Sequence, residues 1–147
     1  MFNNDISEFF KNFGLYKNMV LSTAENKKVH SRMMSIVCFN HKFYFQTDKN
    51  FNKCFDIEAN PYVSLCIDNI SVEGLCNIIG KPCANEKFCD IFKSANPKAY
   101  ELYTMLDDEV LYEIKPCYIK LWLYENNEPY IKIYDINSQS VEMKKYL

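Results

Sequence analysis

The sequence predicts a mainly β protein whose strands form a closed or nearly closed antiparallel barrel flanked by short helices. About seven segments have the alternating, β-branched or aromatic pattern of strands, and nearly all of them follow one another through short polar turns. Sequential hairpins favour an antiparallel barrel over a doubly wound parallel sheet. The 147 residues contain no repeat, linker or low-complexity tract, so we expect residues 1–147 to form one domain.

The first residues predict an amphipathic helix that ends at Gly14, because glycine commonly terminates helices. Its apolar side chains recur with helical spacing and should pack on the body of the domain. They are Phe2, Ile6, Phe9, Phe10 and Phe13. Strands are then expected over residues 17–24, 29–39 and 42–47, separated by turns at residues 25–28 and 40–41.

The next predicted element is a short helix that begins after Asn50, a good N-cap, and ends before Pro61. Two further strands follow, with Asn69-Ile70 as their link. Later segments contain two helices, an acidic gap at residues 107–109, a terminal hairpin and a short helix in the tail. Their expected bounds are strands 62–68, 71–81, 117–124 and 129–136, and helices 86–92, 97–106 and 138–147.

The composition argues against several classes of function. Seventeen basic residues balance nineteen acidic ones without a basic block, which disfavours binding to nucleic acid or to an anionic membrane. The N-terminus lacks the pattern of a signal peptide, and no segment reaches transmembrane length, so we expect a cytoplasmic protein. The seven cysteines contain no CxxC pair and are interpreted as reduced. No zinc-site spacing is present, and no metal is predicted.

Three residues in the middle of the strand-rich region suggest a phosphate site. Arg32 is the only arginine, and alternation places it on the same strand face as Met34. If Phe39 faces Lys42 across the turn, Met34 lies opposite Thr47, which makes Arg32 the diagonal neighbour of Thr47, about 7–8 Å away at Cα. Lys53 near the start of the next helix would add a second cation. A guanidinium suits bidentate phosphate binding.

Each of these residues also has a simpler interpretation. Arg32 could form a surface ion pair, Thr47 could merely end a strand, and Lys53 could be a solvated helix residue. Trp122, the only tryptophan, could be a half-buried barrel or interface residue, or the wall of a ligand pocket. No nucleophile–base pair, paired carboxylates, P-loop or GxGxxG motif is visible, so catalytic residues remain unassigned and hydrolase or kinase chemistry has no support.

The stretch from Arg32 to Asp68 resembles the pyridoxamine 5′-phosphate oxidase-like family of FMN-binding split barrels. In that family an arginine begins a strand whose backbone follows the flavin, another strand ends in threonine, a lysine-containing turn follows, and a helix ends in Asn-Pro. The matching residues here are Arg32, Met33, Met34, Ser35, Ile36, Gln46, Thr47, Asn52, Lys53, Asn60 and Pro61. Gly80-Lys81 and the late strand with Trp122 extend the similarity to roughly residues 17–136.

The resemblance implies an antiparallel split β-barrel of about six to seven strands that holds FMN at the interface of a homodimer. Arg32, Thr47 and Lys53 would bind the 5′-phosphate, with Gln46 and Asn52 in the same motif. Residues 33–36 would line the ring system, and Trp122 could reach the flavin from the partner chain. The segment after Trp122 lacks the arginine and histidine that bind substrate in true pyridoxamine phosphate oxidases. The chain is more similar to small nitroimidazole-reductase-like members.

The expected activity is FMN-dependent oxidation or reduction of a small molecule, with NAD(P)H as the reductant. In such enzymes the cofactor performs the redox step and the protein positions it. Three alternatives remain open at this point: a non-catalytic flavin-binding or sensory module, a haem-binding split barrel, and a barrel that binds deazaflavin.

Overall fold

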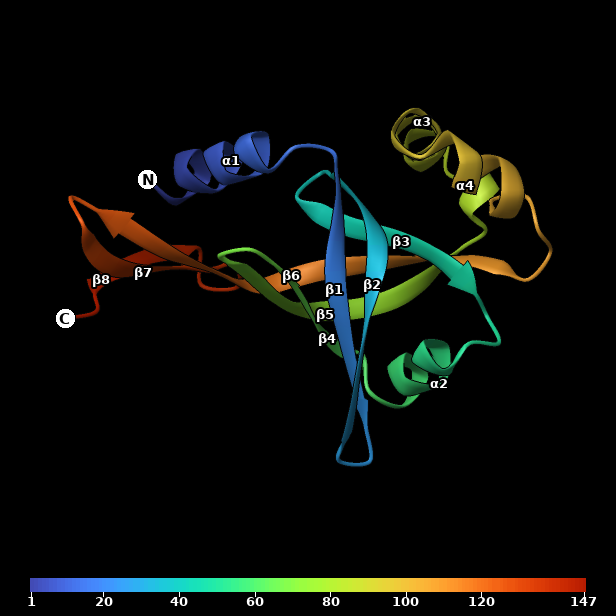
Figure 1. Ribbon diagram of the computed structural model, residues 1–147, viewed down its shortest axis with the longest axis horizontal. Helices are drawn as coiled ribbons and strands as arrows, with labels where there is room; N and C mark the ends of the chain where they lie inside the picture. The colour runs from blue at the N-terminus through green and yellow to red at the C-terminus, as the bar shows by residue number, and fades with distance from the viewer.

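A six-stranded antiparallel barrel forms the centre of the computed structural model, which describes residues 1–147 (Figure 1). The strands run in the order β3-β2-β1-β4-β5-β6, and pairing of β3 with β6 closes the barrel. Two further strands, β7 and β8, extend the sheet from β6 beyond the barrel. The strand bounds are β1 Tyr16–Glu25, β2 Lys28–Phe39, β3 Lys42–Asp48, β4 Tyr62–Ile67, β5 Ile70–Gly80, β6 Glu109–Glu125, β7 Glu128–Asp135 and β8 Ser140–Lys145.

The helices lie around this sheet, as Figure 1 shows. The N-terminal helix α1 lies over the β7–β8 side and ends at Gly14, whose φ of 89° is readily adopted by glycine. Helices α3 and α4 pack together at the opposite end, and α2 follows β3. None of the helices has both the length and the apolar composition needed to cross a membrane. Their bounds are α1 Phe2–Phe13, α2 Asn52–Ala59, η1 Pro82–Ala84, α3 Glu86–Ala95 and α4 Pro97–Tyr103.

Side chains of β2 alternate between two faces, as the sequence predicts, and each face packs into a separate hydrophobic cluster. Ile36 and Cys38 point into the barrel, where they belong to a cluster of 21 buried residues. Val37 and Phe39 point outward and pack with Phe88 of α3 in a second, smaller cluster. Helix α3 therefore covers the outside of the barrel wall next to the β2–β3 turn.

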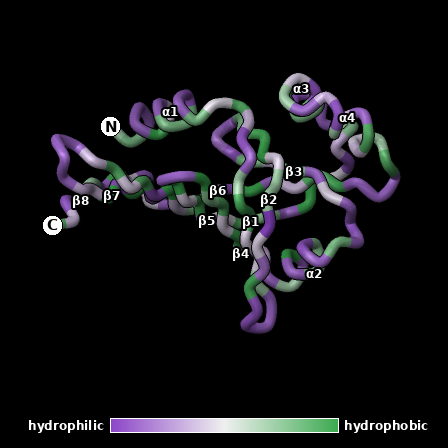
Figure 2. Tube along the Cα trace, in the orientation of Figure 1, coloured by the Kyte–Doolittle hydropathy of each residue, from purple (hydrophilic) through white to green (hydrophobic).

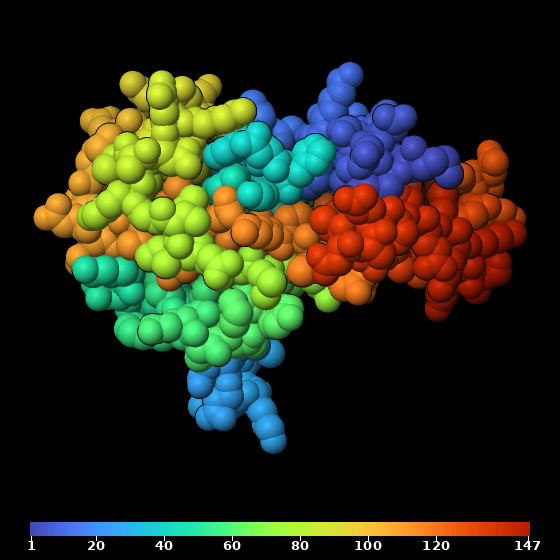
Figure 3. Space-filling view, turned by 180° about the vertical axis from the view of Figure 1, so that it is seen from behind, coloured from blue at the N-terminus to red at the C-terminus, as the bar shows by residue number.

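The β1–β2 hairpin extends well beyond the barrel. Its turn, at Asn26 and Lys27, is hydrophilic in Figure 2 and projects from the body of the molecule in the space-filling view of Figure 3. The β7–β8 hairpin lies at the end of the molecule opposite α3 and α4.

Strands β2 and β3 pair over only three residues on each side of their turn. Phe39 faces Lys42 as predicted, and the positive φ angles of Asn40 and His41 are those of a primed hairpin turn. The ladder ends at the pair Val37–Tyr44. Beyond it, β2 stays with β1 and β3 pairs with β6. The barrel wall is therefore split between the two strands.

Two predictions about the last third of the chain are wrong. Strand β6 begins at Glu109, whereas the sequence pattern suggested a start at residue 117, and its first half is the segment that closes the barrel on β3. The tail forms strand β8 and not a helix. Alternation of Val141 and Met143 with polar residues suits an edge strand paired to β7. Smaller corrections concern α4, which ends at Tyr103, and the β4–β5 turn, which precedes Ile70.

Candidate functional site

A cavity of about 490 Å³ lies where β2 and β3 separate. Strands β2 and β3 supply one wall, α3, α4 and the segment that follows α4 supply another, and the first turn of α2 lies between them. The lining residues are Met33, Met34, Ser35, Gln46, Thr47, Asp48, Phe51, Lys53, Phe92, Ala99, Tyr103, Leu106 and Glu109. The cavity thus combines apolar and aromatic side chains with a few polar groups, as ligand sites generally do.

Lys53 and Thr47 form the polar centre of this cavity. Both residues are buried, with 8% and 5% of their surface exposed, and Lys53 Nζ donates a hydrogen bond to Thr47 Oγ1 at 3.0 Å. The same ammonium lies 4.7 Å from the centre of the Phe51 ring. Burial lowers the pKa of Lys53, and the positive charge of Arg32 acts in the same direction. A buried lysine without a carboxylate within ion-pair distance has an unbalanced charge that an anionic ligand would neutralise.

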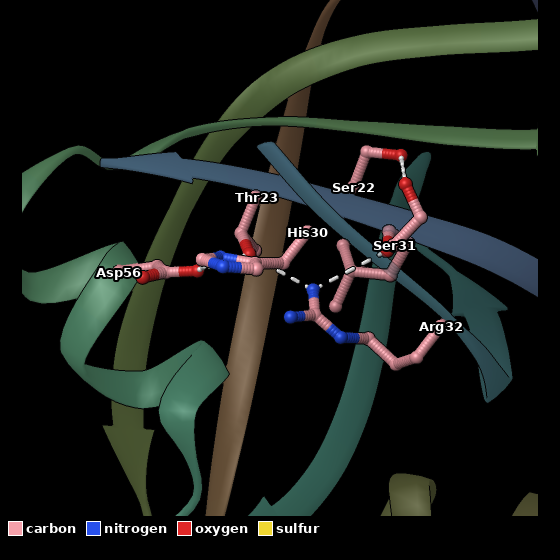
Figure 4. Close-up of polar contacts among 7 residues, drawn as sticks. Ser22, Thr23, His30, Ser31, Arg32 and Asp56 are labelled. Atoms are coloured by element: carbon pink, nitrogen blue, oxygen red, sulfur yellow. Dashed lines mark hydrogen bonds and ion pairs between the residues drawn. The ribbon is translucent and has the colours of Figure 1, made fainter. Parts of the chain in front are cut away.

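Arg32 does not lie next to Thr47 through the β2–β3 ladder, because that ladder ends before it reaches either residue. Its guanidinium crosses instead to β1, where Arg32 Nη1 donates to Thr23 Oγ1 at 2.9 Å and to the Leu21 carbonyl at 3.3 Å (Figure 4). Burial lowers the pKa of Arg32, although Asp56 opposes this shift. The charge of Arg32 nevertheless acts on Lys53, so the two cations belong to one region.

Asp56 on α2 balances part of this positive charge. Thr23 Oγ1 donates to Asp56 Oδ2 at 2.8 Å, and His30 Nδ1 lies 2.9 Å from the same oxygen (Figure 4). Burial of Asp56 favours its neutral form, but the hydrogen bonds from Thr23 and His30 and the charges of His30 and Arg32 outweigh it, so the pKa of Asp56 is lowered. Thr23 thus connects the arginine to the carboxylate.

Sequence reasoning missed Thr23 and Asp56. Two signals could have found them: Thr23 interrupts the apolar inward positions of its strand, and Asp56 follows Lys53 by three positions, which places both on one helix face.

Glu109 is the other residue that the sequence did not identify, because it was interpreted as part of an acidic gap. It is the first residue of β6, pairs with Asp48 of β3, lines the cavity and is only 6% exposed. Burial raises the pKa of Glu109 to about 7, the negative charge of Asp48 acts in the same direction, and Lys53 opposes both. A carboxyl group in this environment is partly protonated near neutral pH.

The predicted cofactor residues are only partly brought together. Six of them line the cavity, namely Met33, Met34, Ser35, Gln46, Thr47 and Lys53. Ile36 is buried in the barrel core, and Asn52 is exposed in the first turn of α2. Trp122 lies in the distal half of β6, is 38% exposed, and contacts the rings of Tyr124 and Tyr146 rather than the cavity. Arg32 is not among the lining residues, and its guanidinium contacts Thr23 and Leu21.

Residues 6–123 match the sequence model of the family described as pyridoxamine 5′-phosphate oxidase. The chain belongs to this family. The match spans the whole barrel up to the distal half of β6, and the six-stranded antiparallel barrel described above is the split barrel that membership leads us to expect. None of the curated proteins matches the sequence.

Solved structures with this fold include proteins with different ligands. General Stress Protein 26 from Bacillus anthracis is 28% identical, with 81% of this chain and 92% of that one covered and a TM-score of 0.62. A pyridoxamine 5′-phosphate oxidase-related, FMN-binding protein from Nostoc punctiforme is 13% identical, with coverages of 88% and 87% and a TM-score of 0.60. The haem storage protein HutZ from Vibrio cholerae is 14% identical, with coverages of 78% and 89% and a TM-score of 0.58. The last two similarities establish the fold alone.

Proposed function

We propose that this protein is an oxidoreductase that binds FMN in the cavity between β2 and β3. The observation that carries the proposal is the buried Lys53–Thr47 pair, with Arg32 close enough to influence the lysine. The two cations and the hydroxyl are suited to the phosphate of a nucleotide. The apolar lining from Met33, Phe92 and Tyr103 is suited to a planar ring system. The cavity therefore offers compatible groups for both the phosphate and the ring system of FMN.

The residues of the chain would bind and orient the cofactor rather than react. Lys53 and Thr47 would hold the phosphate, and Arg32 would contribute its charge. Met33, Met34 and Ser35 would border the ring. FMN held in this way would supply the redox chemistry between a reduced nicotinamide and a small acceptor. Residues 126–135 contain neither arginine nor histidine, so we do not propose pyridoxamine phosphate as the substrate.

We further propose that the active form is a homodimer with the cavity near the interface. Large apolar side chains of the cavity lining and of α2 are exposed in one chain: Met33 to 63%, Phe51 to 54% and Phe55 to 57%. A second copy of the chain would cover them and could bring its Trp122 to the flavin. Sedimentation equilibrium should give twice the chain mass, and a monomer that binds FMN fully would contradict the dimer.

The decisive experiment is to purify the protein, record its absorption spectrum and identify the released cofactor by mass spectrometry. A flavin spectrum and the mass of FMN are expected, and NAD(P)H should bleach the spectrum. The variant Arg32→Ala/Lys53→Ala should lose FMN while its circular dichroism is unchanged. Lys49→Ala is the matched control, because Lys49 is an exposed lysine that pairs with Asp108. A protein that takes up no FMN would refute the proposal.

Haem is the second candidate, because a haem storage protein shares the fold. The chain offers two histidines as ligands. His30 Nδ1 is held by Asp56, and His41 stacks on Phe10 with ring centres 4.5 Å apart. Neither histidine lines the cavity, which favours FMN. A Soret band would select haem, a released deazaflavin would select that cofactor, and bound FMN that NAD(P)H cannot reduce would select a non-catalytic module.

A further inference from the structure

Glu109 carries a buried carboxyl group. This group has no role if FMN is bound through Lys53 and Arg32 alone. It lines the same cavity as Lys53 and Thr47, and it takes part in none of the ion pairs of the structure. Lys53 directs its hydrogen bond to Thr47 and not to this carboxyl. The charge of Lys53 nevertheless acts on Glu109, so the two groups are close in electrostatic terms.

The groups that face Glu109 come from three elements. Strand β3 contributes Asp48, its cross-strand partner. Helix α2 contributes Lys53 and the Cys54 thiol, and Tyr103 at the end of α4 lines the same cavity. Lys53 is thus the one cation among them, and it faces two carboxyl groups. An anion that enters next to Lys53 must therefore approach Asp48 and Glu109 as well.

We infer that Glu109 is part of the phosphate site and holds a proton when the phosphate of FMN is bound, so that it can donate a hydrogen bond to a phosphate oxygen. The inference rests on the proposed function. Two adjacent anions in a cavity of low polarity repel each other strongly, and a proton on the carboxyl removes that repulsion. Glu109 is the better acceptor of this proton because it is more buried than Asp48.

The consequence is that binding of FMN takes up a proton. Burial already raises the pKa of Glu109 to about 7, and a neighbouring phosphate dianion raises it further. Above pH 7 the free protein must gain a proton before the phosphate fits. Linkage then requires the affinity to fall by up to about tenfold for each pH unit above that value. Riboflavin lacks the phosphate and should bind without this dependence.

The test measures dissociation constants of FMN by fluorescence quenching at pH 6.5 and pH 8.5. For the wild-type protein we expect the constant to rise by about 20-fold over this range. For Glu109→Gln, which keeps a hydrogen-bond donor but cannot ionise, we expect a rise of less than about threefold. Lys53 is present in both proteins, so any change in its protonation appears in both curves. The matched control is Glu113→Gln, whose carboxyl lies on the same strand but accepts from Tyr44 outside the cavity. This control should behave like the wild type.

Calorimetric titration in two buffers of different ionisation enthalpy gives the proton uptake directly and needs no variant. At pH 8 the wild-type protein should take up close to one proton for each FMN and about none for riboflavin. If FMN binds with equal affinity at both pH values and without proton uptake, the inference about Glu109 is wrong while the proposed function stands. If the wild-type protein binds no FMN at all, both are wrong.

Discussion

Lys53 Nζ donates to Thr47 Oγ1 across 3.0 Å, and both side chains are buried in the wall of the cavity. The pair joins the first turn of α2 to the penultimate residue of β3. The ammonium group of Lys53 is therefore held in position before any ligand binds. A charge that is fixed in advance loses little entropy when it binds an anion.

Replacing Lys53 by methionine should separate ligand binding from stability. The variant keeps the apolar stem but removes the charge, so we expect FMN affinity to fall by about 10- to 100-fold, which corresponds to the roughly 1.5–3 kcal/mol of a hydrogen bond to a charged group. The free protein should unfold at the same or a higher temperature, because burying the ammonium is costly. Flavin titration and thermal denaturation measure the two effects. An unchanged affinity for FMN would show that Lys53 is not part of the binding site.

The variant Thr23→Val should destabilise the protein, because it removes the hydroxyl that accepts from Arg32 and donates to Asp56. Asp56 then keeps only its contact with His30, and Arg32 keeps only the Leu21 carbonyl, so the loss should cost about 1–3 kcal/mol. Ser22→Ala is the matched control on the adjacent position of β1, where an exposed hydroxyl contacts Ser31, and it should cost less than about 0.5 kcal/mol. Urea denaturation compares the two. Equal effects would mean that the Arg32–Thr23–Asp56 network contributes nothing to stability.

Asp56→Asn should change how stability depends on acidity. The pKa of Asp56 is lowered in the folded protein, so its contribution is complete above the ordinary value of 3.8 and is lost as the pH falls below it. Near pH 6 the variant should be less stable by about 1–3 kcal/mol, and the difference should shrink towards pH 3. Urea titrations between pH 3 and pH 6 provide the measurement. A difference that stays constant across this range would contradict the ionised state of Asp56.

Gly74→Ala should disturb the barrel where β5 passes a bulge of β6. A Cβ atom at this position would lie 2.6 Å from the Lys115 carbonyl oxygen and 2.9 Å from Ile114 Cγ2. The ladder between β5 and β6 changes register here, so the backbone of β6 must shift to make room, at a cost of about 1–3 kcal/mol. Ser71→Ala on the same strand serves as the control, with little expected change. Equal unfolding temperatures for both variants would show that the strands adjust freely.

The sequence pattern predicted those parts of the fold that depend on local periodicity. Helix α1, the β2–β3 turn and the alternation of Ile36 and Val37 on β2 all follow from side-chain spacing within one segment. The first half of β6 was missed because it follows Asp107 and Asp108, and its strand character depends on pairing with a distant β3. The tail was misassigned for the same reason, since β8 exists as the partner of β7.

The candidate site shows a similar limit. Thr47 and Lys53 meet because six positions separate a strand end from a helix start, which is a local relationship that the sequence expresses. Arg32 was expected beside Thr47 on the assumption that the β2–β3 ladder continued. Because the two strands separate, the guanidinium of Arg32 contacts Thr23 of β1 instead. Glu109 lies in the site only because β6 pairs with the distant strand β3. No pattern in the residues next to Glu109 indicates this pairing.

The pairing of β3 with β6, which closes the barrel, also determines at what stage of synthesis the cavity can form. Residues 43–48 pair with residues 109–114, so the ribosome must synthesise about three quarters of the chain before the ring of strands can close. Contacts between such distant segments form slowly because a long loop must first be ordered. Glu109 lines the cavity from β6, the strand of this pair that is synthesised later. A nascent chain that stops before β6 therefore lacks a complete cavity, and binding of the proposed flavin would be one of the final steps in the maturation of the protein.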